Sequence, residues 1–457
     1  MRRHLPSLPR AAWQLLAAGS LSAVANGLTY PFLVVYLHRV RDLSLGTAGV
    51  AAATIATAAI AVNLAAGPLV DRLGPRRVVA AMLLLGACGA ATLAFAASVP
   101  LALVGSALFG AGLTTGWVGL QQVIAAVVPQ HQRSDAFAVQ FAILNAGIGL
   151  GGLSAGLLVD FDQPETFEAA FLAAAACYLV FAAVLPFVAV PPRHAGANAG
   201  RSGGYRRIAA DRRFRLVFLL NVVFVGIGVG QIESGFPAFA TEVGDATPRI
   251  LGLAFAADTA VIVLCQVWVT ARLRGRRRTR GLMLESVFWA AAWATALAAA
   301  WLNAPYLFIG VAVLFACAEM LHSPTIPAIV NDLATDELRG RYNAAGGLSW
   351  QTARILGATT SGQLLGLGLG GPLLAGFIGL CGLGALLALR LERALPPEAN
   401  GMSSTHAKPV DIRSEHDRRA EAADLPGGGA AGDDFRRRAG AVDDAARRIA
   451  ADRGART

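Results

Sequence analysis

The fold class of this chain is decided by the stretch Gly67-Pro68-Leu69-Val70-Asp71-Arg72-Leu73-Gly74-Pro75-Arg76-Arg77. This short, strongly basic segment with one acid lies between two long apolar runs. Because only a few residues separate the runs, we predict a helical hairpin. Its tip should face the cytosol, where the basic loops of membrane proteins gather.

The composition is that of a membrane protein. The chain has 457 residues, of which 55% are hydrophobic and 15% are charged, whereas soluble domains carry about 25% charged residues. Apolar runs recur from Ala11 to Leu391, and each is long enough to cross a hydrocarbon core of about 30 Å. The sequence lacks the short alternating segments of a membrane β-barrel. We therefore predict an all-α, polytopic membrane protein.

The net charge of +10 reports the topology and does not indicate a nucleic-acid partner. The basic residues fall in alternate loops, as the positive-inside rule requires. The loops on the other side are nearly bare, with Arg39, Arg41 and Arg249 as exceptions. We therefore expect both termini in the cytosol. The arginines assigned to the cytosolic side are Arg2, Arg3, Arg10, Arg72, Arg76, Arg77, Arg206, Arg207, Arg212, Arg213, Arg215, Arg272, Arg274, Arg276, Arg277, Arg278 and Arg280.

The cysteines indicate neither a metal site nor a disulfide framework. All five lie in apolar runs without the spacing of metal ligands. We expect no cofactor and no bound metal. The apolar stretch that follows the basic start reaches Leu37, which is too long for the core of a signal peptide, so it should be an uncleaved first span. The cysteines are Cys88, Cys177, Cys265, Cys317 and Cys381.

Twelve transmembrane helices are predicted, arranged as two pseudo-symmetric six-helix bundles. We expect an N-terminal bundle over 1–190, a cytosolic linker over 191–213, a C-terminal bundle over 214–393 and a flexible cytosolic tail over 394–457. The predicted spans are 11–37, 47–69, 78–98, 101–127, 136–159, 168–190, 214–240, 249–271, 281–302, 304–330, 342–366 and 369–391.

An internal duplication supports the two bundles. Asp71–Arg77 aligns with Ala271–Arg277, 200 residues later, and Tyr30-Pro31 resembles Phe236-Pro237. Such parallel repeats place a solute site between the halves, near the middle of the membrane. Three further matches share an offset of 206 residues: Arg133 with Arg339, Gly151 with Gly357 and Gly156 with Gly362.

The basic stretch resembles the loop between spans two and three of the major facilitator superfamily. That resemblance implies a transporter, and it implies that Asp71 lies by the cytosolic end of span eleven and helps to hold the outward-facing state. A helix N-terminus there, near Tyr342, would stabilise a carboxylate by roughly 0.3–1 kcal/mol. Arg339 or Arg341 would complete the charge cluster. The alternative is that the arginines only anchor the loop. The latch residues are Gly67, Asp71, Arg72, Gly74, Arg76 and Arg77.

Two other stretches bear on the branch of the family. Gly147–Gly156 resembles the motif of twelve-span drug and metabolite exporters, with Gly152 in place of the motif's proline. Small residues also let helices approach closely, so packing alone is another explanation. In span four, Ser106 stands where a related motif has an arginine tied to proton movement, so that route for protons is not expected.

Charged side chains inside the spans are candidates for coupling, because each costs about 2.5–3.5 kcal/mol to insert. Glu319 and Arg354 lie at equal depth in neighbouring spans, so we predict that they pair. His322 follows Glu319 by one helical turn and could relay a proton. Glu233 and Asp258 lie in spans seven and eight. A static structural ion pair remains the alternative to proton or solute binding.

Uncharged polar residues with helical spacing are candidates for lining the solute cavity. Their number is small beside alanines and aromatics, which favours an amphiphilic or apolar solute over a sugar. Each could instead form an interhelical hydrogen bond, worth about 0.6 kcal/mol. The candidates are Asn26, Tyr30, Trp117, Gln121, Gln140, Asn145, Gln231 and Gln351.

The function that these features favour is proton-coupled export of a small amphiphilic solute by a monomer in the cell membrane. One alternative is an importer of a small organic anion, with Arg354 as its counter-ion. Another is a membrane sensor or partner protein that acts through its tail. The Gly-x-Ser-x-Gly match at Gly152–Gly156 lies within a predicted span and not at a strand-to-helix elbow, and the sequence has no phosphate-binding loop. We therefore expect no enzyme activity, and an ion gradient must drive any pumping.

Overall fold

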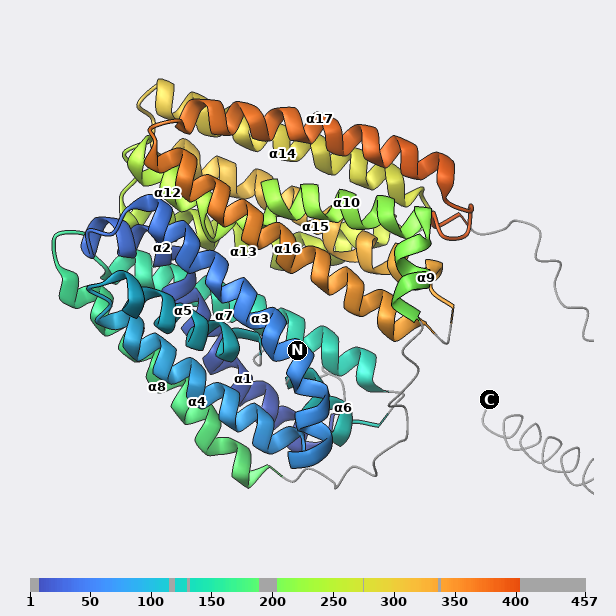
Figure 1. Ribbon diagram of the computed structural model, residues 1–457, viewed down its shortest axis with the longest axis horizontal. Coiled ribbons are helices and arrows are strands. Elements are labelled where there is room, and N and C mark those ends of the chain that lie inside the picture. The colour runs from blue at the N-terminus through green and yellow to red at the C-terminus, as the bar shows by residue number, and fades with distance from the viewer. Residues whose placement is uncertain are drawn as a thin grey trace, which may run out of the picture. The chain divides into compact units, whose positions relative to one another are not determined.

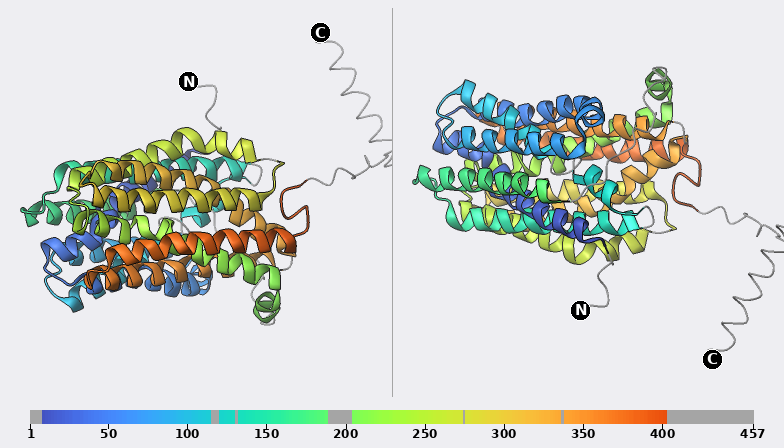
Figure 2. Two further views of the ribbon diagram at one scale, coloured as in Figure 1. Left: turned by 90° about the horizontal axis from the view of Figure 1, so that it is seen from above. Right: turned by 90° about the horizontal axis from the view of Figure 1, so that it is seen from below.

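The structure is a computed structural model that describes residues 8–114, 120–129, 132–188, 204–273, 275–335 and 338–402. These residues belong to one compact unit, Met1–Ser403. They form helices and connecting turns, with a single isolated bridge between Asp160 and Gln163. The predicted all-α class is therefore confirmed. Both views in Figure 2 show most of the helices running side by side along one common direction.

The first half contains six consecutive helical segments. The first segment is α1 (Arg10–Thr29), which continues through the 3₁₀ turn η1 (Tyr30–Phe32), α2 (Leu33–Val35) and the π-helical turn η2 (Tyr36–Val40). The others are α3 (Leu45–Leu73), α4 (Pro75–Ala94), α5 (Val99–Thr114) with α6 (Leu120–Val127), α7 (Arg133–Leu158), and α8 (Pro164–Val184) with η5 (Leu185–Phe187).

The second half repeats this plan after the short helix α9 (Gly204–Ala210). Its first segment is broken into α10 (Arg212–Ile227), α11 (Val229–Ile232) and α12 (Gly235–Glu242). The others are α13 (Pro248–Leu273), α14 (Arg278–Trp301), α15 (Leu307–Leu333), α16 (Arg339–Gly366) and α17 (Gly370–Ala394).

Ten helical segments in the described part of the chain are long and apolar enough to cross a membrane. The two remaining predicted spans correspond to α5 with α6, between which residues 115–119 are not described, and to α16. α16 is less apolar because it carries polar residues such as Gln351 and Arg354 along its length. The count of twelve spans is therefore approximate, and the chain is a multi-pass membrane protein.

The two halves touch through a pair of helices from each. α3 packs against α16, and α7 packs against α13. In Figure 1, α3 accordingly lies beside α16. Spans two and five of the first half thus meet spans eleven and eight of the second, which is the pairing that a parallel duplication predicts. Within each half the helices form their own bundle, for example α1 with α7 and α14 with α15.

The predicted basic loop is almost entirely helical. α3 extends to Leu73 and α4 begins at Pro75, so Gly74 is the one residue between them. Its φ of 81° favours glycine, because a Cβ is strained in that conformation. We call the end of the molecule that carries this turn the arginine-rich end. The opposite end carries the α2–α3 and α12–α13 connections.

Part of the predicted linker is helical and contacts the C-terminal bundle. α9 falls within the predicted linker, and Asp211 caps α10 by accepting from the Arg213 N–H at 2.9 Å. The Tyr342 hydroxyl donates to the same carboxylate at 2.8 Å. This second bond ties the linker to α16, which is why it folds locally.

The first residues of the predicted flexible tail are pinned to α14. The side-chain Oδ1 of Asn400 accepts the Thr279 N–H at 3.0 Å, and its main-chain oxygen accepts the Arg278 N–H at 2.9 Å. Asn400 therefore satisfies N–H groups that a helix start leaves without partners. Within the predicted tail, the segment around Asn400 therefore contacts the start of α14, and residues 403–457 lie outside the description.

Candidate functional site

Glycines set the contact between α7 and α13 at the opposite end. A Cβ added to Gly156 would lie 2.4 Å from Cα of Gly252, so the two backbones touch. Two turns earlier in α7, a Cβ on Gly149 would lie 2.5 Å from the methyl carbon of Thr259. Part of the glycine-rich run Gly147–Gly156 therefore packs one half against the other.

A second face of the same run packs inside the first half. A Cβ on Gly151 would lie 2.3 Å from the carbonyl oxygen of Val24, and one on Gly147 would lie 2.5 Å from Cβ of Ala23. Both contacts are with α1. The run therefore has two roles: one face fixes α7 to its own bundle, and the other meets the partner bundle.

The equivalent contact between α3 and α16 also uses glycines. A Cβ on Gly49 would lie 2.6 Å from the carbonyl oxygen of Ala358 and 2.9 Å from Cα of Gly362. A Cβ added to Gly46 would lie 3.1 Å from the side-chain amide of Gln363. Both contacts between the halves are thus closest at the opposite end.

Toward the arginine-rich end the same helix faces are exposed. Val263 and Val267 continue the Thr259 face of α13 at intervals of four residues, and their exposed fractions are 48% and 80%. On α16, Leu348 is 47% exposed, and Gly347 has no neighbouring atom within 4 Å of an added Cβ. The halves therefore separate from the opposite end toward the arginine-rich end.

A charged cluster joins the two halves about midway along the helices. Nη2 of Arg354 lies 2.5 Å from Oε2 of Glu233, and the guanidinium also donates a hydrogen bond to the Tyr30 hydroxyl. Its Cζ lies 5.1 Å from the centroid of the Tyr30 ring, a cation–π distance. The predicted pairing of Arg354 with Glu319 was wrong, because Glu233 takes that place.

Glu233 reaches Arg354 because span seven is broken. Gly228 has φ −121° and ψ −102°, and Ser234 has φ −142° and ψ −79°, so neither is helical. Gln231 compensates for the break: its Nε2 donates to the Gly226 oxygen at 2.5 Å, and its Oε1 accepts from Ser361 at 2.7 Å. Gln231 is fully buried, and its side chain stabilises the break, so its predicted role in lining the solute cavity stays a prediction.

His322 forms a second buried pair with an acid that the sequence analysis missed. Its Nδ1 lies 2.9 Å from Oε1 of Glu285 on α14, and the same oxygen accepts from the Trp289 indole at 3.0 Å. Both members of the pair are almost completely buried. Nε2 of His322 and Oε2 of Glu285 have no hydrogen-bond partner among the described residues. His322 thus pairs directly with Glu285 and also lies within electrostatic reach of Glu319, so its predicted role beside Glu319 stays a prediction.

Asp258 and Glu319 lie at similar depth on α13 and α15, which pack together. Each is within electrostatic reach of the other, and Glu319 is also within reach of His322, Glu233 and Glu285. Oδ1 of Asp258 is buried without a partner in the described part of the chain. The centre of the second half thus gathers four acids around one arginine and one histidine.

The other uncharged candidates are mostly engaged in packing. Asn26 accepts a hydrogen bond from the Tyr178 hydroxyl, and Nδ2 of Asn145 donates to its own helix at the Phe141 oxygen, 2.9 Å away. Gln140 is buried beside a cavity of about 10 Å³. Gln351 lies one turn before Arg354 and has a buried Oε1 without a described partner. Tyr30 and Gln351 are therefore the candidates that lie at or beside the charged cluster.

Several predicted residues fall outside the description. Trp117 is not described, and only the backbone of Gln121 is. The side chains of Asp71 and Arg72, and the surroundings of Gly67, also lie outside it, so the proposed latch stays a prediction. The remaining latch residues are at the turn itself. Arg77 is exposed, and Nη1 of Arg76 lies 3.5 Å from the Val188 oxygen.

Sequence reasoning missed Glu285 and the acids that hold Arg39 and Arg41. Nε of Arg39 lies 2.6 Å from Oε1 of Glu242, and Nη2 of Arg41 lies 2.8 Å from Oε1 of Glu168. The signal was present, because these two arginines were exceptions to the charge rule on that side of the membrane. Among the described residues, no group of three or more His, Cys, Asp or Glu side chains could hold a metal ion.

These features define the class of the protein. Two homologous helix bundles meet at one end, separate toward the other and share a buried charged cluster, which is the arrangement of an alternating-access membrane transporter. The chain belongs to the Major Facilitator Superfamily, whose family model matches residues 15–358. It is a transporter of small solutes and not an enzyme.

The relatives agree with this membership. An uncharacterized MFS-type transporter of Bacillus subtilis (strain 168), YhjO, is 25% identical over 81% of this chain and 90% of its own length. A Na(+), Li(+), K(+)/H(+) antiporter of Planococcus maritimus is 22% identical over 72% of this chain and 83% of its own. The crystal structure of the nucleoside transporter NupG has the same fold, with a TM-score of 0.65 at 14% identity over 84% of this chain and 99% of that one.

Proposed function

We propose that this transporter exports a small amphiphilic organic solute in exchange for protons, with its arginine-rich end and both termini in the cytosol. No cofactor takes part, and a proton gradient across the cell membrane drives the cycle. The site is the cluster of Tyr30, Glu233 and Arg354 together with the neighbouring acids Asp258 and Glu319.

The excess of buried acids carries the proposal. Glu233, Asp258, Glu285 and Glu319 stand against the cations Arg354 and, when protonated, His322, so at least two carboxyls lack an opposite charge. An unpaired charge inside a membrane costs about 2.5–3.5 kcal/mol. Proton uptake removes that cost, and proton release restores it. A site of this kind therefore ties its charge to its protonation, which a proton-coupled cycle requires.

The arrangement of the halves supports the direction of access. The glycine contacts of Gly156 and Gly49 close the opposite end, while the Val267 face of α13 is exposed toward the arginine-rich end. On the proposed orientation, which follows the positive-inside rule, this state is closed to the outside and accessible from the cytosol. This is the state in which an exporter accepts its solute.

The chemistry of the centre supports the class of solute. The cluster offers one ion pair, one phenol and few uncharged polar groups, with aromatic rings such as Trp350 near His322. A sugar would need many more hydrogen-bonding partners. An amphiphilic molecule needs an apolar wall and one polar or charged contact, which this centre supplies. The named H(+) antiporter relative supports exchange against protons.

The test uses purified protein in proteoliposomes with an imposed pH gradient and ethidium as a fluorescent amphiphilic cation. We expect wild type to move ethidium uphill against protons. Glu319→Gln should lose the uphill movement yet still exchange ethidium at equal concentrations on both sides, because it removes only a titratable group. Glu165→Gln, an exposed acid at the start of α8, is the matched control and should behave as wild type.

Unchanged uphill transport by Glu319→Gln would refute proton coupling through this residue. Gradient-driven movement of an anionic probe, benzoate, in place of ethidium would instead favour the importer, with Arg354 as the counter-ion. A chain that moves no probe in a wider panel of amphiphilic solutes would contradict the proposed class of solute.

A further inference from the structure

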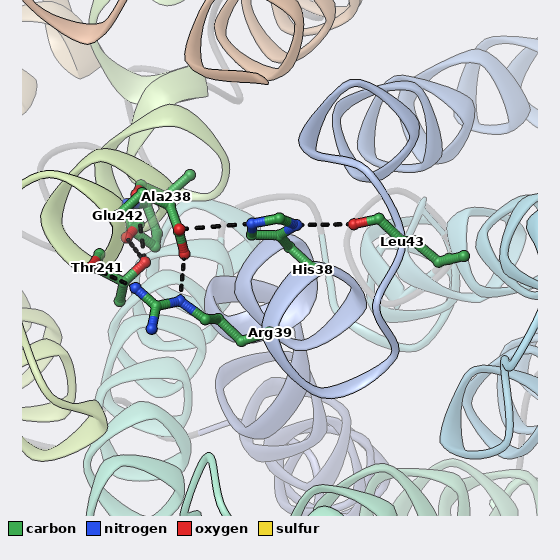
Figure 3. A network of polar contacts seen from close by, with 7 residues as sticks. His38, Arg39, Leu43, Ala238, Thr241 and Glu242 are labelled. Carbon is green, nitrogen blue, oxygen red and sulfur yellow. Dashed lines mark hydrogen bonds and ion pairs between the residues drawn. The ribbon is translucent and has the colours of Figure 1, made fainter. Parts of the chain in front are cut away.

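The end of span one departs from α-helical geometry where it meets the other half. Tyr36–Val40 forms a π-helical turn, and the Arg41 N–H accordingly bonds to the Tyr36 oxygen at 3.1 Å. Such turns are rare and frequently occur at functional sites. This one brings His38 and Arg39 to the end of α12, on the partner half, as Figure 3 shows.

Glu242 is the common partner of both side chains. Its Oε1 accepts from Nε of Arg39 at 2.6 Å, while its Oε2 faces Nε2 of His38 at 3.4 Å. Arg39 adds a second contact with α12, because its Nη2 donates to the Thr241 oxygen at 2.9 Å. One carboxylate is thus flanked by Arg39 and His38, which both belong to the other half of the molecule.

The two holders differ in how they depend on pH. Arginine keeps its charge at every pH that the protein meets. Nδ1 of His38 lies 2.8 Å from the Leu43 oxygen, and a carbonyl oxygen only accepts, so Nδ1 carries the hydrogen. In the neutral ring Nε2 is then a bare lone pair facing a carboxylate. Their 3.4 Å separation is longer than the about 2.7–3.2 Å of an N–H···O hydrogen bond.

We propose that Nε2 of His38 is a proton-binding site, and that the proton it takes up clasps the two halves together at the opposite end. The bound proton converts two facing acceptors into an N–H⁺···O⁻ ion pair with Glu242. Because the clasp joins η2 to α12, it exists only while the halves are closed at this end. Acidification of the solution there therefore favours the closed state.

Among the ionisable groups around the His38–Glu242 contact, His38 is the one whose charge depends on pH. Within η2 the other ionisable groups are Tyr36 and Arg39, and Arg41 and Asp42 follow directly. Burial alone would lower the pKa of Arg41, but bonds to Tyr36 and Glu168 raise it overall, so it stays charged. α3 packs against η2 with no ionisable residue over 45–61, and α2 has none. Histidine is the side chain whose change of charge falls within the range over which the pH outside cells varies.

The placement of this proton outside the cell rests on the proposed orientation. On that orientation, the clasp opposes the outward opening that the exporter needs to release its solute. A low pH outside drives the exchange and at the same time stabilises the closed opposite end. The clasp therefore limits turnover when the proton gradient is steepest. The binding of the proton to His38 itself does not depend on which side that is.

The experiment measures the opposite end directly. Spin labels replace Asp162 in the first half and Tyr306 in the second, in a chain whose five cysteines are alanine, and the distance distribution is recorded in nanodiscs at pH 7.5 and 5.5. We expect the ratio of closed to open molecules to rise roughly two- to five-fold on acidification, as suits a partly exposed ion pair. His38→Gln should abolish that rise. Asp42→Asn, two residues after η2 at a position of positive φ that asparagine tolerates, should keep it.

Transport in the protein with its own cysteines supplies the second measurement. The rate ratio of His38→Gln to wild type should rise roughly two- to five-fold as the medium at this end goes from pH 7.5 to 5.5. A pH response of the distance that survives His38→Gln, or its absence from wild type, would overturn the proposal. If closure depends on His38 but the wild-type protein shows no gradient-driven transport, the result would support the clasp and contradict the proposed function.

Discussion

The replacement Gly156→Ala should open the molecule at the opposite end while leaving each bundle folded. The added Cβ would lie 2.4 Å from Cα of Gly252 and 2.8 Å from the Pro248 oxygen. Ordinary carbon contacts need about 3.5–4.0 Å, and both obstacles are backbone, so the helices must move apart. Because Gly156 meets the other half, that movement opposes the closed state and not the fold.

The expected size follows from overpacking. An extra methyl in a close contact costs about 1–3 kcal/mol. At 1.4 kcal/mol for each factor of ten, the ratio of closed to open molecules should fall by about 5- to 150-fold. Gly151→Ala offers the contrast, because its Cβ would lie 2.3 Å from the Val24 oxygen within the same half. That variant should lower thermal stability in every state.

The assay is the distance distribution between spin labels at Asp162 and Tyr306, recorded for each variant at pH 7.5. Gly156→Ala should populate longer distances. Gly310→Ala is the control, because an added Cβ on that α15 residue has no neighbour within 4 Å. An unchanged distribution in Gly156→Ala, or an equal change in Gly310→Ala, would refute the reasoning that this contact closes the transporter.

Three further predictions follow from individual contacts. Arg354→Gln leaves the buried Glu233 without its ion-pair partner, which should cost about 3–5 kcal/mol of stability. The melting temperature of Arg354→Gln should therefore fall by more than that of Arg354→Lys, and equal melting temperatures would contradict the ion pair. Glu285→Gln should lower the free energy of unfolding by about 1–3 kcal/mol, because it weakens the buried hydrogen bond to His322. A double-mutant cycle with His322→Gln should show a coupling free energy of at least about 0.5 kcal/mol, and additive effects would argue against the pair. Asn400→Ala should cost about 1 kcal/mol through the lost cap of α14, whereas Met402→Ala should leave the melting temperature unchanged.

The sequence was sufficient for the class of fold because hydropathy and the arginine pattern act along the chain. Apolar length predicts a span wherever it occurs, and the positive-inside rule orders the loops. The stretch around Asp71 then named the family. The local structure of this stretch was harder to predict, because α3 and α4 extend so far that only Gly74 separates them.

The pairing of the buried charges could not be predicted from depth. Glu319 and Arg354 do lie in neighbouring spans, but depth does not fix the rotation of a helix about its axis. The breaks at Gly228 and Ser234 turned Glu233 toward Arg354, and no periodicity in the sequence announced them. Glu285 was missed for a different reason: it lies close to the predicted start of span nine, where a charge is inexpensive.

The two exceptions to the charge rule were informative in retrospect. Arg39 and Arg41 stood on the side where arginines are rare, which indicated that each had a partner. The structure gives them Glu242 and Glu168. An unexpected charge near a span end is therefore a reason to search for an acid on a neighbouring helix.

On the proposed mechanism, solute crosses in exchange for protons taken up by the buried acids. Proteoliposomes that contain a pH-sensitive dye test this claim most directly when ethidium is added on one side in the absence of any imposed gradient. We expect ethidium movement in wild type to drive protons the opposite way, with the pH change abolished in Glu319→Gln. Ethidium movement without any pH change in wild type, or the same pH change in both proteins, would contradict the account.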